Sequence, residues 1–245
     1  MPTANFYFHN ELNFFLPSNK KNSKLTHIFE EAASIKDTIE SQGVPHPEVD
    51  LILVNGESVD FSYLIQDGDE INVYPFSQSN QINHPISVRP EPLPVPRFVL
   101  DVHLGKLASS LRMLGLDTLY RNDYDDEELA EISSREKRIL LTRDTGLLKR
   151  SMVVYGYYVR QTNPQKQLIE VIERFQLKKA VNPLKRCISC NGLLAPIAKE
   201  TVIDRIPPKV QETVNEFHSC QDCQQVFWRG SHYDKMRQFI DEVLS

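Results

Sequence analysis

Residues 98–120, FVLDVHLGKLASSLRMLGLDTLY, decide the fold of the central part of the chain. The apolar run Phe98–Leu100 predicts a short buried strand that ends at Asp101. Leucines then recur at helical spacing as far as Leu114, and Gly115 supplies the backbone freedom that commonly ends a helix. A strand followed directly by a helix is the repeating unit of a parallel sheet.

The same pattern continues downstream. A second strand is expected near 117–120, and a helix begins in the acidic cluster 125–128 and runs to about 136. Ile139–Leu141 predicts a third strand and 153–159 a fourth, after which Pro164 opens another helix. Strands that alternate with helices predict an α/β domain whose parallel sheet carries helices on both faces.

The first 78 residues predict a different and smaller fold. Ser34 and Asp37 have capping-box spacing before a short helix that Gly43 ends. Strands are expected at 51–54 and 71–74, with turns between them. Period-two alternation around 9–11 predicts a hairpin before the helix, made by Phe6, Phe8, Leu12, Phe14 and Leu16. The order β-β-α-β-β is that of a β-grasp, or ubiquitin-like, domain.

Residues 34–76, SIKDTIESQGVPHPEVDLILVNGESVDFSYLIQDGDEINVYPF, resemble small sulfur-carrier proteins of the thiamine and molybdopterin pathways. Those carriers end in Gly-Gly, because the terminal carboxylate is converted to a thiocarboxylate. Here the chain reads Tyr74-Pro75-Phe76-Ser77 and continues for 169 residues after Phe76. The resemblance implies the ubiquitin-like fold, and the missing Gly-Gly end argues against the carrier chemistry.

A proline-rich segment separates the two parts. Residues 79–97 hold five prolines, at 85, 90, 92, 94 and 96, and these favour an extended, semi-rigid spacer. The predicted boundaries are a β-grasp domain at 1–78, a linker at 79–97, the α/β domain at 98–180, and a zinc ribbon with a C-terminal helix at 181–245.

Composition and charge limit the class of protein. Hydrophobic residues at 40% and charged residues at 25% exclude a fully disordered or fibrous chain. No apolar run approaches the roughly 18 residues of a membrane helix. The N-terminus lacks the basic and apolar regions of a signal peptide, which predicts a cytoplasmic protein with no membrane contact.

The charge is unevenly distributed. Residues 1–78 hold 4 Lys/Arg against 12 Asp/Glu, whereas residues 79–245 hold 24 against 21. An acidic front domain beside a mildly basic remainder predicts separate partners for the two parts. An acidic β-grasp would repel RNA, so we expect it to bind a protein or another basic surface.

Acidic residues follow the predicted strands. Asp101 and Asp144 each come directly after a strand, and Asp125 and Asp126 open a helix. Functional groups in open α/β sheets gather beyond the carboxyl ends of the strands, and carboxylates are ligands for Mg²⁺ or Mn²⁺. Single aspartates at such positions are also common helix caps and turn residues. Spacing alone leaves both interpretations open.

Residues 98–120 and the run 125–148, DDEELAEISSREKRILLTRDTGLL, closely resemble the Mut-7-type C-terminal RNase domain, a branch of the PIN-like nucleases. The resemblance covers roughly residues 97–240. It implies a PIN-like α/β fold and metal-dependent hydrolysis of RNA phosphodiester bonds. The implied ligands of the catalytic Mg²⁺ or Mn²⁺ are Asp101, Asp126 and Asp144, with Asp125 as a neighbour or substitute.

The resemblance is incomplete at one position. The separate helical glutamate that many PIN-like nucleases use is not identified in this chain, so the resemblance does not set the number of metals. The alternative function is therefore a non-catalytic adaptor that binds RNA or protein and carries a vestigial acidic site.

Basic and aromatic side chains near these motifs are candidate RNA contacts. Lys106, Arg112 and Arg143 lie beside the acids in sequence and could neutralise phosphates, or could be ordinary solvated charges. Trp228 and Arg229 begin the sequence Trp-Arg-Gly-Ser-His, which resembles a signature of the same RNase family. They could grip single-stranded RNA, although a Trp that closes the hydrophobic core of the ribbon is equally consistent.

All four cysteines lie near the C-terminus, in two C-x-x-C pairs: Cys187 with Cys190, and Cys220 with Cys223. Two such pairs place four thiolates at tetrahedral corners and predict a structural Zn²⁺ in a ribbon. A redox pair is the alternative. Residues 191–202 are expected to form a hairpin between the pairs. A last helix is expected to pack through Met236, Phe239, Ile240 and Val243.

Overall fold

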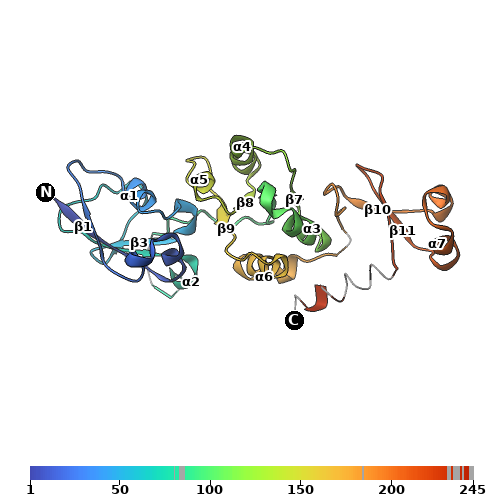
Figure 1. The fold of residues 1–245 in the computed structure, drawn as a ribbon, viewed down its shortest axis with the longest axis horizontal. Coiled ribbons are helices and arrows are strands. Elements are labelled where there is room, and N and C mark those ends of the chain that lie inside the picture. The colour runs from blue at the N-terminus through green and yellow to red at the C-terminus, as the bar shows by residue number, and fades with distance from the viewer. Residues whose placement is uncertain are drawn as a thin grey trace. The chain divides into compact units, whose positions relative to one another are not determined.

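The structure is a computed structural model that describes residues 1–79, 81–82, 86–183, 185–230, 233, 238 and 240–242. The chain, drawn as a ribbon in Figure 1, forms two compact units, and each unit is built from two stretches of sequence. Unit 1 consists of Met1–Pro94 and Asp126–Tyr158, and unit 2 consists of Val95–Asp125 and Val159–Ser245. Within the described ranges, no helix is both long enough and apolar enough to cross a membrane.

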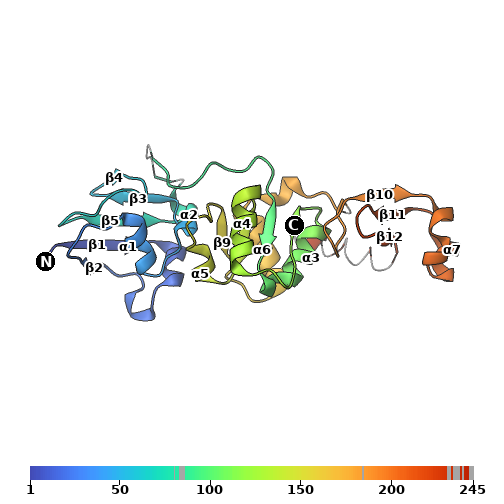
Figure 2. The same cartoon turned by 90° about the horizontal axis from the view of Figure 1, so that it is seen from above.

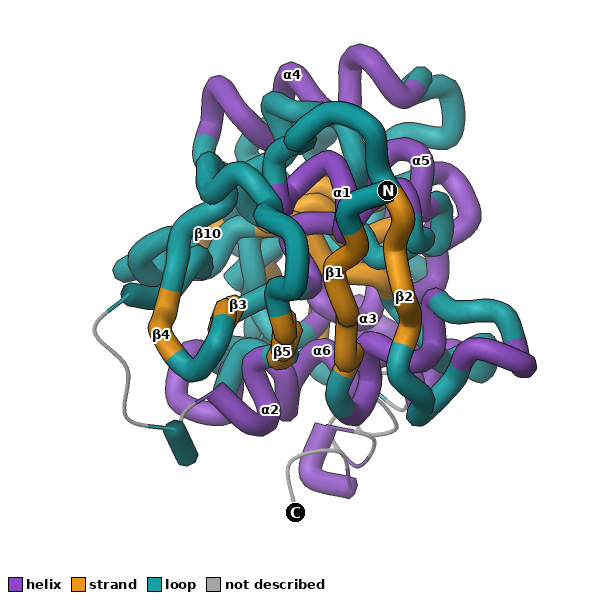
Figure 3. The backbone as a smooth tube through the Cα atoms, turned by 90° about the vertical axis from the view of Figure 1, so that its left-hand side faces the viewer, coloured by secondary structure: helices purple, strands orange, loops and turns teal. Residues whose placement is uncertain are grey.

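A five-stranded mixed sheet forms the β-grasp part of unit 1. Its strands lie side by side in the order β2-β1-β5-β3-β4 (Figure 3), with β1 and β5 parallel and the other pairs antiparallel. The strands are β1 (Thr3–Phe8), β2 (Leu25–Ile28), β3 (Leu51–Val54), β4 (Glu57–Ser58) and β5 (Glu70–Tyr74). The helices are α1 (Ile35–Ser41) and α2 (Phe76–Ser79).

The predicted helix of this domain is confirmed. The backbone N–H of Asp37 donates to Ser34 Oγ at 3.1 Å, which caps the start of α1. Ile35 and Ile39, four residues apart on one face, enter the same buried cluster as the strand residue Phe6. Helix α1 therefore packs on the β-grasp sheet (Figure 2). The local capping signal and the apolar spacing therefore agree on one position for the helix.

The prediction that Leu12, Phe14 and Leu16 lie in the second strand of a hairpin is wrong. Leu12 and Phe14 lie in a 3-10 helix, Asn10–Phe15, and the antiparallel partner of β1 is β2, further along the chain. The Asn13 side chain holds this turn, because its amide donates to the Phe8 carbonyl at 2.7 Å. Leu12 and Leu16 are still buried, because their four-residue spacing fits a helical turn as well as a strand.

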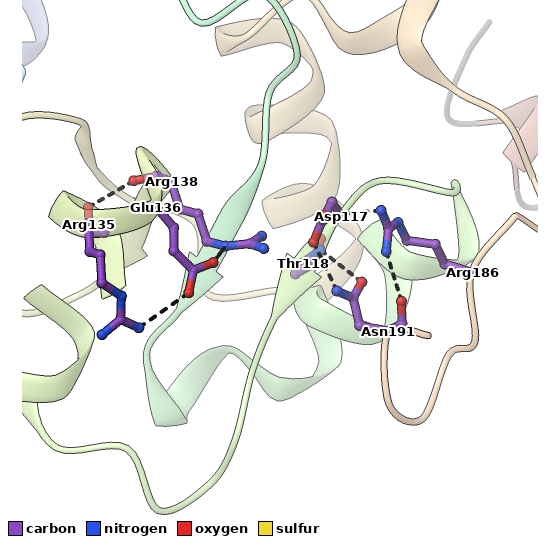
Figure 4. A network of polar contacts seen from close by, with 8 residues as sticks. Asp117, Thr118, Arg135, Glu136, Arg138, Arg186 and Asn191 are labelled. Carbon is purple, nitrogen blue, oxygen red and sulfur yellow. Dashed lines mark hydrogen bonds and ion pairs between the residues drawn. The ribbon is translucent and has the colours of Figure 1, made fainter. Parts of the chain in front are cut away.

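The second stretch of unit 1 contains α4 (Asp126–Glu136), β8 (Ile139–Thr142), α5 (Thr145–Leu148) and β9 (Gly156–Tyr158). Strands β8 and β9 are parallel. Lys137 adopts a left-handed conformation with φ +49°, which ends α4. Glu136 then accepts a hydrogen bond from Arg138 Nε at 2.7 Å (Figure 4), and this bond lowers the pKa of Glu136.

Side chains connect the β-grasp part to α5 and β9 within unit 1. His46 Nε2 donates to the Val153 carbonyl at 2.9 Å, and the Tyr158 N–H donates to Glu48 Oε1 at 2.7 Å. In return, Lys149 Nζ donates to the Glu40 carbonyl at 2.7 Å. Since His46 and Glu48 are buried, these contacts form a specific interface between the two stretches.

The first part of unit 2 consists of β6 (Phe98–Leu100), α3 (Gly105–Met113), β7 (Thr118–Leu119) and α6 (Pro164–Arg174). The central strands have the order β7-β6-β8-β9, and β6 runs parallel to β7. Helix α3 packs against α6, and Phe98 meets Phe175 edge-on, with 5.8 Å between ring centroids. The predicted strand–helix alternation is confirmed, with Asn163 capping the start of α6.

The ribbon contains β10 (Leu194–Ile197), α7 (Pro208–Thr213), β11 (Phe217–Cys220) and β12 (Val226–Trp228), with the strands in an antiparallel sheet (Figure 1). The prediction of a hairpin within 191–202 is wrong. The strand that pairs with β10 is β11, which comes after α7 in the sequence. Val202 and Ile206 are instead buried against Phe217 and form a small core.

The structure describes parts of the proline-rich segment and of the predicted last helix. Residues 86–97 of the proline-rich segment contain no helix or strand. Along this segment, the Val88 N–H donates to the Asp50 carbonyl at 3.0 Å. Of the predicted last helix, Ile240 is buried, whereas Met236, Phe239 and Val243 lie outside the described residues.

Gly115 gives a test of the packing around α3. Its φ is +82°, and a Cβ at this position would overlap the carbonyl oxygen of Asn182. We expect Gly115→Ala to destabilise unit 2 by about 2 kcal/mol or more, from backbone strain together with the overlap. Faster hydrogen exchange of the α3 amides would show this loss.

Gly56→Ala is the matched control. Gly56 also has a positive φ, +93°, but a Cβ there would meet nothing within 4 Å. Its cost should be limited to about 1 kcal/mol of backbone strain. Equal effects of the two substitutions on their own units would contradict the packing argument.

Candidate functional site

Four thiols converge in unit 2. The Sγ atoms of Cys187, Cys190, Cys220 and Cys223 all lie within 4.8 Å of one another. Cys187 Sγ is 3.6 Å from Cys223 Sγ, and Cys190 Sγ is 3.4 Å from Cys220 Sγ. Four ligands at a Zn–S distance of about 2.3 Å around one ion would be about 3.8 Å apart, so the cluster fits a tetrahedral metal site.

Backbone amides of both turns point at the sulfurs. Burial alone would raise the pKa of Cys220, but hydrogen bonds from the N–H groups of Cys223 and Asp222 lower it to about 7. Burial raises the pKa of Cys190 to about 12. Amide N–H groups directed at sulfur favour thiolates, which are the form that binds a metal.

A buried arginine holds the first pair of cysteines to helix α3. Arg112 is 4% exposed, and its guanidinium donates to the carbonyls of Ile188 at 3.2 Å and Ser189 at 2.8 Å, between the two cysteines. The same group donates to the carbonyls of Thr118 and Tyr120. Arg112 therefore has a structural role, joining the start of the ribbon to β7.

A second network joins the same elements (Figure 4). Asn191 accepts from the Thr118 N–H and donates to Asp117, both at 2.9 Å. Arg186 donates to Asp117 at 3.1 Å and to the Asn191 carbonyl at 2.9 Å. Asp117 therefore supports the four-cysteine cluster through its hydrogen bonds with Arg186 and Asn191, which lie on either side of Cys187 in the sequence.

Asp144 is both a helix cap and an exposed carboxylate. It begins α5, where its Oδ1 accepts from the N–H groups of Gly146 at 2.6 Å and Leu147 at 3.3 Å. Its Oδ2 has no hydrogen-bond partner among the described residues. The two bonds to Oδ1 fix the carboxylate in direction and leave the second oxygen available to a ligand.

The other predicted acids occupy the positions expected from the sequence. Asp126 is the first residue of α4, and both it and the preceding Asp125 are exposed. Asp101 directly follows β6 and is 7% exposed, and its side chain does not cap the short helix that follows.

The predicted basic and aromatic contacts have different surroundings. Lys106 is exposed on α3, and the Arg143 guanidinium lies 5.7 Å from the centroid of the Tyr158 ring. Trp228 packs on Phe217 at the core of the ribbon. Arg229 is exposed and pairs with Glu216 at 3.5 Å. Ser231 and His232, which complete the signature that begins at Trp228, lie outside the described residues.

Two structural features were not predicted from the sequence. The anchoring role of Arg112 could have been inferred from Ala108, four residues earlier, which places Arg112 on the apolar face of its helix. The contact of Phe14 and Phe15 with Tyr158 joins two stretches far apart in the chain. No local pattern indicates such a contact.

The comparisons with known proteins agree with both resemblances. The model of the Mut7-C RNAse domain matches residues 96–240, which is more than half of the chain. The model of the Mut7-C ubiquitin domain matches residues 1–81. Searches of curated proteins and of solved structures gave no significant match. The chain therefore belongs to the Mut7-C RNase domain family, with a Mut7-C ubiquitin-like domain in front of the RNase domain.

Proposed function

We propose that the chain is a metal-dependent ribonuclease that hydrolyses phosphodiester bonds of RNA. Membership of an RNase domain family indicates a nuclease and makes RNA the expected substrate. The finer proposal is that Asp101, Asp126 and Asp144 bind one catalytic cation and that Asp125 assists them. Each follows a strand or opens a helix of a parallel α/β domain, where functional groups are commonly found.

The geometry of Asp144 carries this proposal. A carboxylate with one oxygen held by two backbone N–H groups and the other without a partner is oriented before any ligand arrives. Preorganisation of this kind lowers the cost of binding. An ordinary helix cap needs only one oxygen, so the exposed Oδ2 of Asp144 is not required for the fold.

The donor set suits a hard divalent cation, since all the proposed ligand atoms are carboxylate oxygens. A bound Mg²⁺ or Mn²⁺ would supply water activation and would stabilise charge on the phosphate. The role of Asp101, Asp126 and Asp144 is to hold the cation. Lys106, Arg143 and Arg229, which carry exposed or half-exposed charges, are proposed to contact phosphates, and Trp228 to contact bases. Arg112 is left out of this proposal because it is buried.

Asp144→Asn tests the proposal directly. Asparagine caps helices about as well as aspartate, so α5 should persist, whereas the lost charge should weaken cation binding. We expect cleavage of single-stranded RNA with Mg²⁺ or Mn²⁺ to fall by orders of magnitude, roughly a hundredfold or more. Cleavage would be followed on a labelled oligonucleotide, and folding by circular dichroism.

Asp204→Asn is the control. Asp204 is exposed in a short helical turn of the ribbon and lies outside the proposed site. Its substitution should leave cleavage unchanged. Unchanged cleavage by Asp144→Asn would refute the assignment. A wild-type chain that binds RNA but does not cleave it with either metal would favour a non-catalytic adaptor.

We also propose that the four cysteines hold one structural Zn²⁺. Structural zinc contributes on the order of 10 kcal/mol to a small module, so Cys190→Ser should unfold the ribbon. The β-grasp part, in the other unit, should stay folded. Ser189→Ala alters the same turn without removing a ligand and should keep the metal. Elemental analysis of purified protein should give one zinc per chain, and a substantially lower value would contradict the proposal.

Three further points stay predictions. The domain boundaries at 78, 97 and 180 could be tested by limited proteolysis. A cytoplasmic location is proposed because a reducing compartment keeps thiols available for metal, and cell fractionation would test it.

A protein partner of the acidic β-grasp domain would be tested by pull-down with Glu30→Lys and Glu31→Lys. Equal capture by wild type and variant would count against an electrostatic partner.

A further inference from the structure

Three aromatic rings meet where the β-grasp part joins β9, within unit 1. The Phe14 centroid lies 5.3 Å from the Tyr158 centroid, and the Phe15 centroid lies 5.4 Å from it. Phe14 and Phe15 also contact each other edge-on at 5.4 Å. Phe14 is 46% exposed, so a large aromatic side chain remains open to solvent even though it belongs to a packed cluster.

Arg143 extends this cluster toward Asp144. Its guanidinium carbon lies 5.7 Å from the Tyr158 centroid, within the range of a cation–π contact. Arg143 immediately precedes Asp144, which carries the proposed function. Arg143 therefore links the aromatic cluster, through its contact with Tyr158, to the residue that follows it, Asp144.

The acidic β-grasp domain is locally basic beside Phe14. Of its four lysines, Lys20, Lys21 and Lys24 lie in the connection between β1 and β2, which contains Phe14, and Lys24 pairs with Glu70 at 3.4 Å. Between β1 and β2, the only acid is Glu11. The Asn22 N–H donates to Asn13 Oδ1 at 2.6 Å, which ties the lysine-bearing loop to the residue before Phe14.

We propose that Phe14, Tyr158 and Arg143 form a base-stacking platform for single-stranded RNA, with Lys20 and Lys21 neutralising its phosphates. This inference rests on the proposed ribonuclease function and assigns the β-grasp domain a part in it. Sequence-tolerant binding of single strands combines exposed aromatic rings with nearby positive charge. The Phe14–Tyr158 cluster has both, next to the proposed site.

The competing role for these rings is a hydrophobic seal between the two stretches of unit 1. The two roles differ in what they require of residue 14. A seal needs only apolar volume, which leucine supplies, whereas base stacking needs a flat π surface. Phe14→Leu should therefore weaken RNA binding, and Phe14→Trp should restore it.

The experiment uses the full-length chain and a single-stranded RNA oligonucleotide that contains 2-aminopurine. Binding is measured by anisotropy without added Mg²⁺ or Mn²⁺, so that it is separated from cleavage, and stacking is measured by fluorescence quenching. We expect Phe14→Leu to weaken binding by roughly fivefold to a hundredfold and to abolish the quenching. Ile28→Ala, at an apolar position in the same domain that is 59% exposed, should change neither signal.

Each outcome decides the proposal. Wild-type affinity and quenching in Phe14→Leu would overturn it and leave the rings as a seal. Absence of RNA binding by the wild-type chain would also overturn it. Loss of binding in Phe14→Leu together with rescue by Phe14→Trp would support it, even if the wild type does not cleave RNA. In that case the proposed hydrolysis would fail while the platform stands.

Discussion

Both units depend on side chains that satisfy backbone polar groups of a neighbouring segment. Buried N–H and C=O groups need partners, and an unpaired one costs roughly 1–3 kcal/mol. In unit 2 the Arg112 guanidinium supplies donors to four carbonyls, two of them between the first pair of cysteines. In unit 1 Glu48 accepts from the Tyr158 N–H. The ubiquitin-like part and the ribbon are therefore built into the units that hold the central strands.

The predictable parts of the fold are those whose signals are local. The cap at Ser34, the proline at 164 and the glycine at 115 indicated the limits of three helices, because each acts within one turn of its own position. The errors at 12–16 and 191–202 have a common cause. In both cases the strand that completes the pair, β2 or β11, lies further along the chain than expected. Apolar residues that were assigned to a nearer strand lie instead in the turns and short helices between the paired strands.

The candidate sites were likewise predictable where the signal is local and unpredictable where tertiary packing decides. Two C-x-x-C pairs bring their own geometry, so four thiols could be expected to meet, as they do. Arg112 was a candidate phosphate contact or solvated charge, but tertiary packing buries it, as its position on the apolar face of α3 could have indicated. For Asp144 the helix-cap interpretation is confirmed through Oδ1, and metal binding through Oδ2 is compatible with it. One carboxylate can serve both purposes because it has two oxygens.

The hydrogen bond from Tyr158 to Glu48 has a consequence for the exposed edge of the central strands. β9 stands last in their order, so no strand among the described residues pairs with its other side. Open edges invite pairing with strands of other molecules, and proteins commonly protect them with a charge or a covering segment. Glu48 does both here, because it is an acid and it belongs to another domain. The ubiquitin-like domain thus occupies a backbone donor on this edge with which a strand of another molecule could otherwise pair.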